Sequence, residues 1–188
     1  KIVAICDIQQ GPLETTLKHI AKYNVPAPKV YTGSERAFEQ MLNNEEFDCV
    51  IIASPWEWHV PMSVAAMKAG VPYVGVEVSA ANTLEECWDL VNVSESTGSQ
   101  LCILENVCYR RDCLAVLNIV REGLFGELLH ATCGYEHDLR DVKFNNGKNY
   151  TYKKGDELRM GPTAFAEAQW RTNHSIRRNG DVYPTHGI

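Results

Sequence analysis

Four short apolar runs, spaced along the first part of the chain, constrain its fold more than any other feature. They cover residues 2–6, 49–53, 73–76 and 101–104. Each run is too short for a buried helix and is rich in β-branched residues, which predicts strands buried on both faces, as in a parallel sheet. Helical patterns lie between the runs, so strand and helix alternate along the chain. The sequence therefore predicts a doubly wound α/β fold.

The segments between these runs carry apolar residues at helical spacing. Pro61 near the start of one segment and Gly70 at its end are residues that helix termini prefer. Thr83 and Glu86 have the spacing of a capping box at the start of another. The expected apolar stripes are Phe38, Met41 and Leu42, then Val60, Val64 and Met67, then Leu84, Trp88 and Val91.

Charge and cysteine content narrow the classes of function. The net charge of −6 argues against nucleic acid or an anionic membrane as partner, because both need a basic face. No apolar run approaches the roughly 18 residues of a membrane span, and no signal peptide opens the chain. The seven cysteines lack the spacing of a disulfide framework or a zinc site, so we expect free, buried thiols and no bound metal. The compartment and the oligomeric state, including a homo-oligomer, stay open.

Polar residues follow each of the four predicted strands. In dinucleotide-binding folds the ligand lies at the carboxyl ends of parallel strands, so these residues are candidates for a cofactor site. The candidates, in chain order, are Asp7, then Trp56, Glu57, Trp58 and His59, then Glu77 and Val78, then Glu105 and Asn106.

Each candidate has a chemical role and a structural alternative. Asp7 can accept hydrogen bonds from the adenosine ribose hydroxyls, or it can cap a helix. The two tryptophans can cover a flat ring while His59 donates a hydrogen bond, or the cluster can be packing at a helix start. Glu77 and Asn106 can bracket a ribose and a nicotinamide, or each can belong to a cap or turn. Four polar strand ends in series favour the cofactor site.

The glycine fingerprint of dinucleotide-binding folds precedes such an acidic residue by about 20 residues. Counted back from Asp7, it would lie upstream of Lys1. We therefore expect an internal stretch of a longer protein, with a Rossmann-like sheet that lacks its first strand and its glycine loop. Residues 1–107 are the expected partial dinucleotide-binding domain, and residues 108–188 are an incomplete second domain of the α+β type.

The second domain is expected to supply a substrate pocket. The pattern predicts a helix over residues 111–123, a strand over 128–137, a loop over 145–161 and a short helix over 163–170. Hydroxyl donors, a histidine and a cation suit a sugar pocket. They are Tyr135 and His137 at the strand end, Arg171 at the helix end, and Tyr183, Pro184, Thr185 and His186 near the end of the chain. His137 can equally be a structural histidine.

Strands that end in Ser54-Pro55 and in Glu77, followed by Glu105-Asn106 and a helix into a second domain, resemble the Gfo/Idh/MocA family of NAD(P)-dependent sugar oxidoreductases. This resemblance covers residues 1 to about 130. Typical dehydrogenases of that family carry Glu-Lys-Pro where this chain has Glu77, Val78 and Ser79. The family's lysine works in proton transfer at the substrate hydroxyl, which Val78 cannot do. Two alternatives stay open. One is simple dehydrogenation of a sugar or inositol, and the other is a non-catalytic role in binding a sugar or a cofactor.

Longer motifs are similar to glycoside hydrolase family 109, whose members are NAD-dependent α-N-acetylgalactosaminidases. The motifs are residues 56–59, 77–79, 104–112, 170–172 and 178–187.

This resemblance implies that Asp7, Trp56, Glu57, Trp58, His59, Glu77, Val78 and Asn106 contact NAD. It implies that Tyr135, Arg171, Tyr183, Pro184, Thr185 and His186 line the pocket for a terminal α-linked N-acetylgalactosamine. His186 would be the acid/base, with Tyr183 also near the nicotinamide. In the family mechanism the sugar C3 hydroxyl is oxidised, the C2 proton is lost, the glycosidic oxygen is expelled, water adds and the hydride returns. No pair of carboxylates across the bond is needed.

Overall fold

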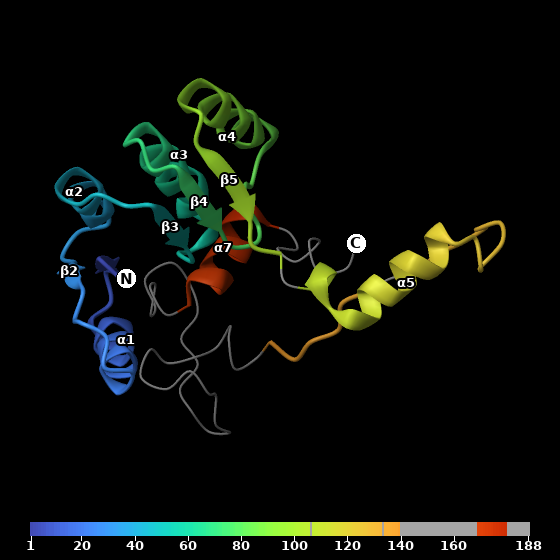
Figure 1. Ribbon diagram of the computed structural model, residues 1–188, viewed down its shortest axis with the longest axis horizontal. Coiled ribbons are helices and arrows are strands. Elements are labelled where there is room, and N and C mark those ends of the chain that lie inside the picture. Colours follow the sequence, from blue (N-terminus) through green and yellow to red (C-terminus); the bar gives the residue numbers. More distant parts are fainter. Residues whose placement is uncertain (106, 133, 140–168, 180–188) are drawn as a thin grey trace. The chain divides into compact units, whose positions relative to one another are not determined.

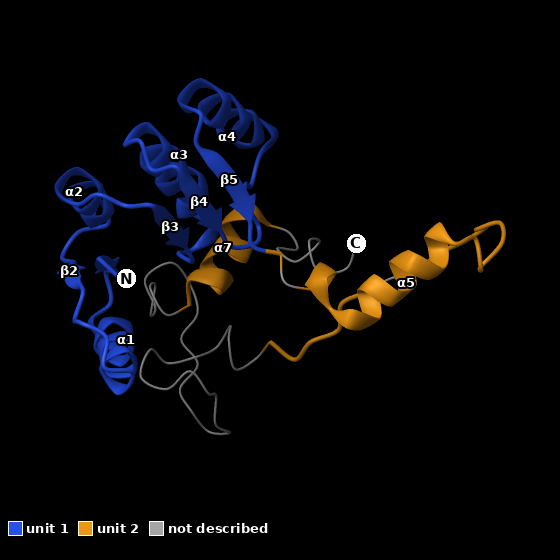
Figure 2. Cartoon of the chain, in the orientation of Figure 1, with its two compact units in different colours: residues 1–104 blue, residues 105–188 orange. Residues whose placement is uncertain are grey.

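A computed structural model describes residues 1–105, 107–132, 134–139 and 169–179. The chain divides into two compact units, residues 1–104 and residues 105–188 (Figure 2).

Strands and helices alternate along the first unit (Figure 1), as the sequence predicts. Every strand pair in it is parallel, which confirms the predicted fold class. In chain order the elements are β1 (Ala4–Cys6), α1 (Gln10–Lys22), β2 (Lys29–Tyr31), α2 (Ala37–Asn44), β3 (Cys49–Ile52), the 3-10 turn η1 (Trp56–Trp58), α3 (His59–Lys68), β4 (Tyr73–Val76), α4 (Leu84–Thr97) and β5 (Gln100–Ile103).

The strands form two sheets, β1-β2 and β3-β4-β5, rather than one. The register pairs Ile5 with Val30 in the first sheet and Val50 with Val74 in the second. In the doubly wound order 3-2-1-4-5-6, the strands on either side of the first strand belong to the two halves of the sheet. β2-β1 and β3-β4-β5 correspond to these halves, and no described residue forms a strand between them.

Helix α1 and strand β2 are not among the predicted elements. The strand has three residues, and Val30 is its one aliphatic side chain, so it carries no apolar run that a pattern search could detect. The helix buries Leu13 and Ile20, two residues seven positions apart. Leu17, which lies between them and is partly buried, completes an apolar stripe at i, i+4 and i+7 that the sequence prediction missed.

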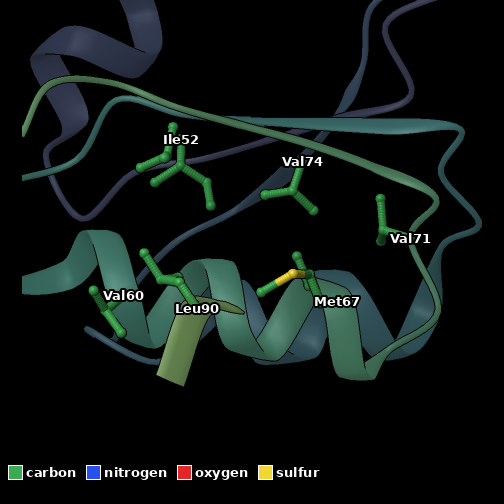
Figure 3. Close-up of a cluster of buried hydrophobic side chains, with 8 residues drawn as sticks. Ile52, Val60, Met67, Val71, Val74 and Leu90 are labelled. Carbon is green, nitrogen blue, oxygen red and sulfur yellow. The ribbon is translucent and has the colours of Figure 1, made fainter. Parts of the chain in front are cut away.

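The main core lies between the β3-β4-β5 sheet and helices α3 and α4 (Figure 3). Val60 and Met67 of the predicted α3 stripe are buried there, and Val64 is partly buried. Phe38 and Met41 of the α2 stripe are also buried. The helical spacing therefore identified the inward faces of α2 and α3.

The stripe predicted for α4 is wrong. Leu84, Trp88 and Val91 are 69%, 59% and 45% exposed, whereas Leu90 is 4% exposed and belongs to the core. The face that meets the sheet includes Leu90 and the partly buried Val93. Apolar side chains occur on two sides of this helix, and only the position of the sheet decides which side is buried.

The prediction that the strands are buried on both faces is also wrong for the described part. Helix α3 packs on the face that carries Ile52 and Val74. Successive strand residues point to opposite faces, and on the opposite face Ile51 is 63% and Tyr73 55% exposed.

All six described cysteines are free, as predicted, but four of them are exposed rather than buried. Two of the exposed thiols, Cys49 and Cys102, lie on the exposed face of the β3-β4-β5 sheet. Cys133 lies outside the described residues.

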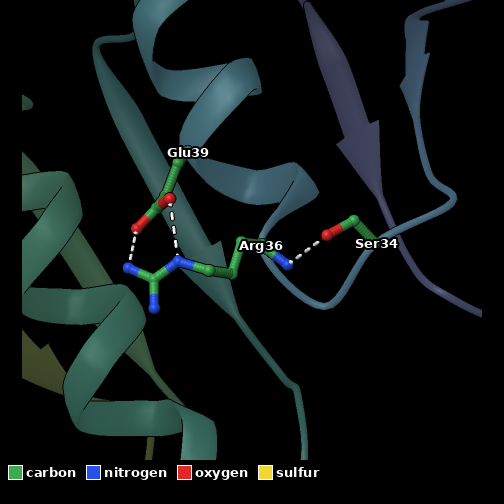
Figure 4. Close-up of polar contacts among 3 residues, drawn as sticks. All are labelled: Ser34, Arg36 and Glu39. Atoms are coloured by element: carbon green, nitrogen blue, oxygen red, sulfur yellow. Dashed lines mark hydrogen bonds and ion pairs between the residues drawn. The ribbon is translucent and has the colours of Figure 1, made fainter.

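An ion pair marks the start of α2 (Figure 4). Arg36 precedes the helix and donates from both Nη2 and Nε to the Glu39 carboxylate, the latter at 3.0 Å. The backbone N–H of Arg36 donates to Ser34 Oγ at 3.1 Å. The hydrogen bonds from Arg36 lower the pKa of Glu39, which lies in the first turn, where the helix dipole favours a negative charge.

The second unit contains η2 (Val107–Tyr109), α5 (Arg111–Arg121) and α7 (Trp170–Arg178). Helix α5 confirms the predicted helix, and its apolar residues Leu114, Leu117 and Val120 are each about two-fifths exposed. Trp170 begins a helix rather than ending one. In the described part of both units, no helix is long and apolar enough to cross a membrane.

The strand predicted over residues 128–137 is wrong for the residues that the structure describes there, which form no ladder. Leu128 and Leu129 are 61% and 86% exposed. A strand needs a neighbour to hydrogen-bond with, and apolar content alone does not supply one. The predicted loop at 145–161 and most of the predicted helix at 163–170 lie outside the described residues.

Candidate functional site

The candidate cofactor residues of the first unit lie where its parallel strands end. Strands β3, β4 and β5 are in register, so their carboxyl ends meet at one edge of the sheet. The segments that follow β3 and β4 are joined at that edge by several hydrogen bonds. This is the edge at which a doubly wound sheet binds its ligands.

Asp7 follows β1 directly, and its backbone is held by the sheet. Its N–H donates to the Tyr31 carbonyl at 3.3 Å, and its Oδ1 accepts from Gln9 N at 2.8 Å. Gln9 is the residue that precedes α1. Asp7 therefore organises the turn before the helix without being the cap itself. Burial raises the pKa of the neighbouring Cys6 thiol, and the Asp7 charge raises it further.

Trp56 lies at the start of η1, directly after Pro55, and is 6% exposed. Its indole Nε1 donates to the Val78 carbonyl at 3.1 Å. This bond connects the segment after β3 with the segment after β4. The sequence left two roles open for the tryptophans, namely covering a flat ring or packing at a helix start. The structure shows Trp56 as a packed, hydrogen-bonded side chain.

His59 begins α3 and is 1% exposed. Its Nδ1 is 2.6 Å from the Ser79 carbonyl oxygen, and its Nε2 is 2.8 Å from the Ser54 carbonyl oxygen. A neutral imidazole carries one N–H and donates to one of these carbonyls, whereas an imidazolium donates to both. Both ring nitrogens therefore face the protein backbone.

Trp58 and Glu57, the other two residues of the cluster, point elsewhere. The Trp58 ring packs edge-on against Phe38 of α2, with centroids 6.0 Å apart. Glu57 is exposed. The four consecutive residues thus divide into two that connect the loops and two that face a helix and solvent.

The segment after β4 contains Glu77, Val78 and Ser79, with a cis peptide bond between the last two. Glu77 N donates to the Ile52 carbonyl at 2.9 Å, which continues the ladder between β4 and β3, and the Glu77 side chain is exposed. A few residues later, Asn82 Nδ2 donates to the Trp56 carbonyl at 3.1 Å.

Sequence reasoning missed the connecting roles of Ser54, Ser79 and Asn82. The two serines take part through their backbone carbonyls, so their side chains give no signal. Asn82 precedes the capping-box threonine, and a side-chain amide at that place was the one available clue.

The predicted residues of the second unit are described only in part. Tyr135 donates to or accepts from His137 Nδ1, and the rings stack edge to face with centroids 5.6 Å apart. The Arg171 guanidinium lies over the Trp170 ring, 4.2 Å from its centroid, a cation–π contact at the start of α7. Asn106, Tyr183, Pro184, Thr185 and His186 lie outside the described residues.

Comparison with known proteins assigns both units. Residues 1–104 match the model of an oxidoreductase family with an NAD-binding Rossmann fold, and residues 109–188 match the glycosyl hydrolase 109 C-terminal domain. Over its whole length the chain is 83% identical to an alpha-N-acetylgalactosaminidase of Tannerella forsythia. The chain belongs to glycosyl hydrolase family 109, within the Gfo/Idh/MocA oxidoreductases.

Other family 109 relatives agree. The chain is 83% identical to a family 109 protein of Parabacteroides distasonis over 189 residues, and 51% identical to one of Stenotrophomonas maltophilia over 192 residues. Each comparison includes 100% of this chain and 41% of the relative. The chain therefore spans about two-fifths of the length of the relatives that it matches.

Solved structures support the fold of this family 109 chain. It is similar to myo-inositol 2-dehydrogenase from Lactobacillus plantarum, with 24% identity and a TM-score of 0.57 over 68% of this chain and 35% of that one. It is also similar to the WlbA dehydrogenase from Bordetella pertussis in complex with NADH and UDP-GlcNAcA, with 20% identity and a TM-score of 0.54 over 71% of this chain and 36% of that one.

NAD is the cofactor of the domain that residues 1–104 match, and two polar groups of the structure fit such a ligand. The Asp7 carboxylate uses Oδ1 for the turn, while Oδ2 accepts no hydrogen bond from the described residues. Ser54 Oγ, at the end of β3, is buried without a hydrogen-bond partner among the described residues. A buried polar atom at a ligand-binding edge is satisfied when a ligand group or water bonds to it.

Proposed function

We propose that the full-length protein is an NAD-dependent α-N-acetylgalactosaminidase that releases terminal α-linked N-acetylgalactosamine from glycans. The observation that carries this proposal is the 83% identity, across the whole chain, to a relative that bears that activity in its name. Val78 supports it, because a valine cannot perform the proton transfer for which sugar dehydrogenases of the superfamily use lysine.

The cofactor would lie along the carboxyl edge of the strands. Asp7 would accept hydrogen bonds from the adenosine ribose hydroxyls through the oxygen that the turn leaves open. The remaining direct contacts would come from Glu57, Trp58, Glu77, Val78 and Asn106. Trp56 and His59, whose side chains are buried, would hold the loops that carry these residues. NAD, when bound, would take a hydride from the sugar C3 and return it at the end of the cycle.

The sugar would be held by residues of the second unit. Tyr135 and Arg171 would donate hydrogen bonds to it, together with Tyr183 and Thr185, and Pro184 would line the pocket. Tyr183 would also approach the nicotinamide. His186 would move protons at the sugar hydroxyl and at C2, since an imidazole can do this near neutral pH.

Release of p-nitrophenol from p-nitrophenyl α-N-acetylgalactosaminide tests the function. We expect the full-length protein with NAD⁺ to release the phenol without steady accumulation of NADH. Stoichiometric NADH without phenol would instead identify a dehydrogenase, and neither product would identify a non-catalytic relative. His186→Ala should abolish phenol release, and full activity of that variant would contradict the assignment of the acid/base.

The carboxyl edge of the strands, which we call the cofactor edge, can be tested separately with Asp7→Asn. Asparagine keeps an oxygen for the Gln9 N–H but removes the negative charge, so the turn is preserved. Because a hydrogen bond to a charged group contributes about 1.5–3 kcal/mol, we expect NAD⁺ to bind at least about tenfold more weakly. Asp48→Asn, an exposed residue at the amino end of β3, is the matched control and should leave the affinity unchanged.

A further inference from the structure

The segments that follow β3 and β4 are joined by three side chains. We define the loop clamp as His59, Trp56 and Asn82. Every clamp bond ends on a backbone carbonyl, namely those of Ser54, Val78, Ser79 and Trp56. A carbonyl acceptor fixes the path of the main chain and leaves the side chain of that residue free to do something else.

His59 is the central member of the clamp because it alone reaches both segments with one rigid ring. Its two nitrogens are 2.6 Å and 2.8 Å from carbonyl oxygens of residues 25 positions apart, Ser79 and Ser54. The ring is 1% exposed, so it has no surface left for a ligand. An imidazole is planar and has two χ angles, so it holds the two carbonyls at a fixed separation.

We propose that His59 is a positioning residue for the cofactor edge: it acts on NAD by locking the two loops together, not by touching the dinucleotide. This proposal rests on the proposed function, since it places NAD at this edge. It assigns direct contact to groups that the clamp presents toward the ligand, such as the exposed Glu77 and the partly exposed Val78.

The loop on the β4 side is the one that needs such a support. Helix α4 begins only at Leu84 with Thr83 as its cap, so residues 77–82 have no helical ladder of their own. Their backbone carbonyls at Val78 and Ser79 are bonded by clamp side chains rather than by a neighbouring strand. Loss of the clamp should therefore loosen this segment before it affects the sheet.

The test compares His59→Gln with His19→Gln in the full-length protein. Glutamine can donate to one of the two carbonyls but cannot span both, whereas His19 is exposed on α1 and serves as the matched control. We expect His59→Gln to weaken NAD⁺ binding about tenfold by calorimetric titration of nucleotide-free protein, while His19→Gln binds normally.

Hydrogen exchange separates positioning from general stability. In the nucleotide-free His59→Gln protein, amides of residues 54–58 and 77–83 should exchange faster together, while those of α4 keep their protection. Equal loss of protection in α4, or unchanged exchange in both segments, would overturn the proposal. Unchanged NAD⁺ affinity in a protein with loosened segments would also overturn it.

A second variant decides the matter if His59→Gln does not fold. Asn82→Ala removes the donor to the Trp56 carbonyl, with the exposed Asn92→Ala as control. Asn82→Ala should loosen the same two segments and weaken NAD⁺ binding, and normal exchange and affinity would overturn the clamp. If the wild-type protein does not bind NAD⁺ at all, the proposed function fails, while the exchange data still show whether the clamp exists.

Discussion

The capping box at the start of α4 gives a prediction that the structure makes quantitative. Thr83 Oγ1 accepts from Glu86 N at 3.1 Å. In return, Glu86 Oε2 accepts from Thr83 N at 3.1 Å and from Asn82 N at 2.6 Å. The Glu86 carboxylate therefore satisfies two backbone donors that the helix itself cannot pair.

We expect Glu86→Ala to lower the free energy of unfolding by about 1–2 kcal/mol. Loss of a cap side chain costs about 1 kcal/mol, and loss of a negative charge in the first turn costs about 0.3–1 kcal/mol. The exposed neighbour Glu85 provides the matched control, because Glu85→Ala removes the same charge without a box bond. It should cost only the charge contribution, about 0.3–1 kcal/mol.

Urea unfolding of both variants and of the wild-type protein, with the m values compared, measures the difference. A double-mutant cycle with Thr83→Ala adds a second criterion. Either single change breaks the reciprocal box, so the double variant should lose less stability than the sum of the two single losses. Equal destabilisation by Glu86→Ala and Glu85→Ala would refute this account of the helix start.

Three further outcomes follow from packing and charge. Met67→Ala should lower the free energy of unfolding by about 2–5 kcal/mol in urea, because Met67 is 0% exposed in the core, and a loss below about 1 kcal/mol would contradict that packing. The hydrogen bond from Lys29 Nζ to the Glu45 carboxylate, at 2.6 Å, lowers the pKa of Glu45 and raises that of Lys29. Glu45→Gln should therefore destabilise the protein near pH 7 and progressively less as the pH falls through the lowered pKa, since the carboxylate is lost there; a penalty that grows in acid would reverse the sign. Near neutral pH, maleimide should label Cys6 more slowly than the exposed Cys102, because burial raises the pKa of Cys6 and only the thiolate reacts. Peptide mass mapping measures the two labelling rates, and equal rates would contradict this explanation.

Local patterns were sufficient for much of the fold. The short apolar runs predicted strands β1, β3, β4 and β5, because runs of four or five residues are too short for a core helix. The capping box and the glycine after α3 were readable because caps depend on a few neighbouring residues. Strand β2 was not readable, since a strand with one aliphatic residue is set by its partner β1 and not by its own sequence.

The candidate site shows the same division. The sequence located polar residues after β1, β3 and β4, and the register of the sheet places the ends of β3 and β4 at one edge. It could not tell which of Trp56 and Trp58 turns inward, because consecutive residues in a tight turn differ in direction by an amount that only the packed backbone fixes. The structure connects Trp56 to Val78 and packs Trp58 on Phe38.

The sequence by itself thus determined the alternation of strand and helix from β3 to β5, the end of α3, the start of α4, and the family motifs. Tertiary structure alone decided that Leu90 rather than Trp88 is buried on α4, because both sides of that helix are apolar and the sheet selects one. It also decided that His59 faces two backbone carbonyls. Those carbonyls come from segments far apart in the chain. Every residue has a backbone carbonyl, so the amino-acid sequence does not show which carbonyl accepts a hydrogen bond.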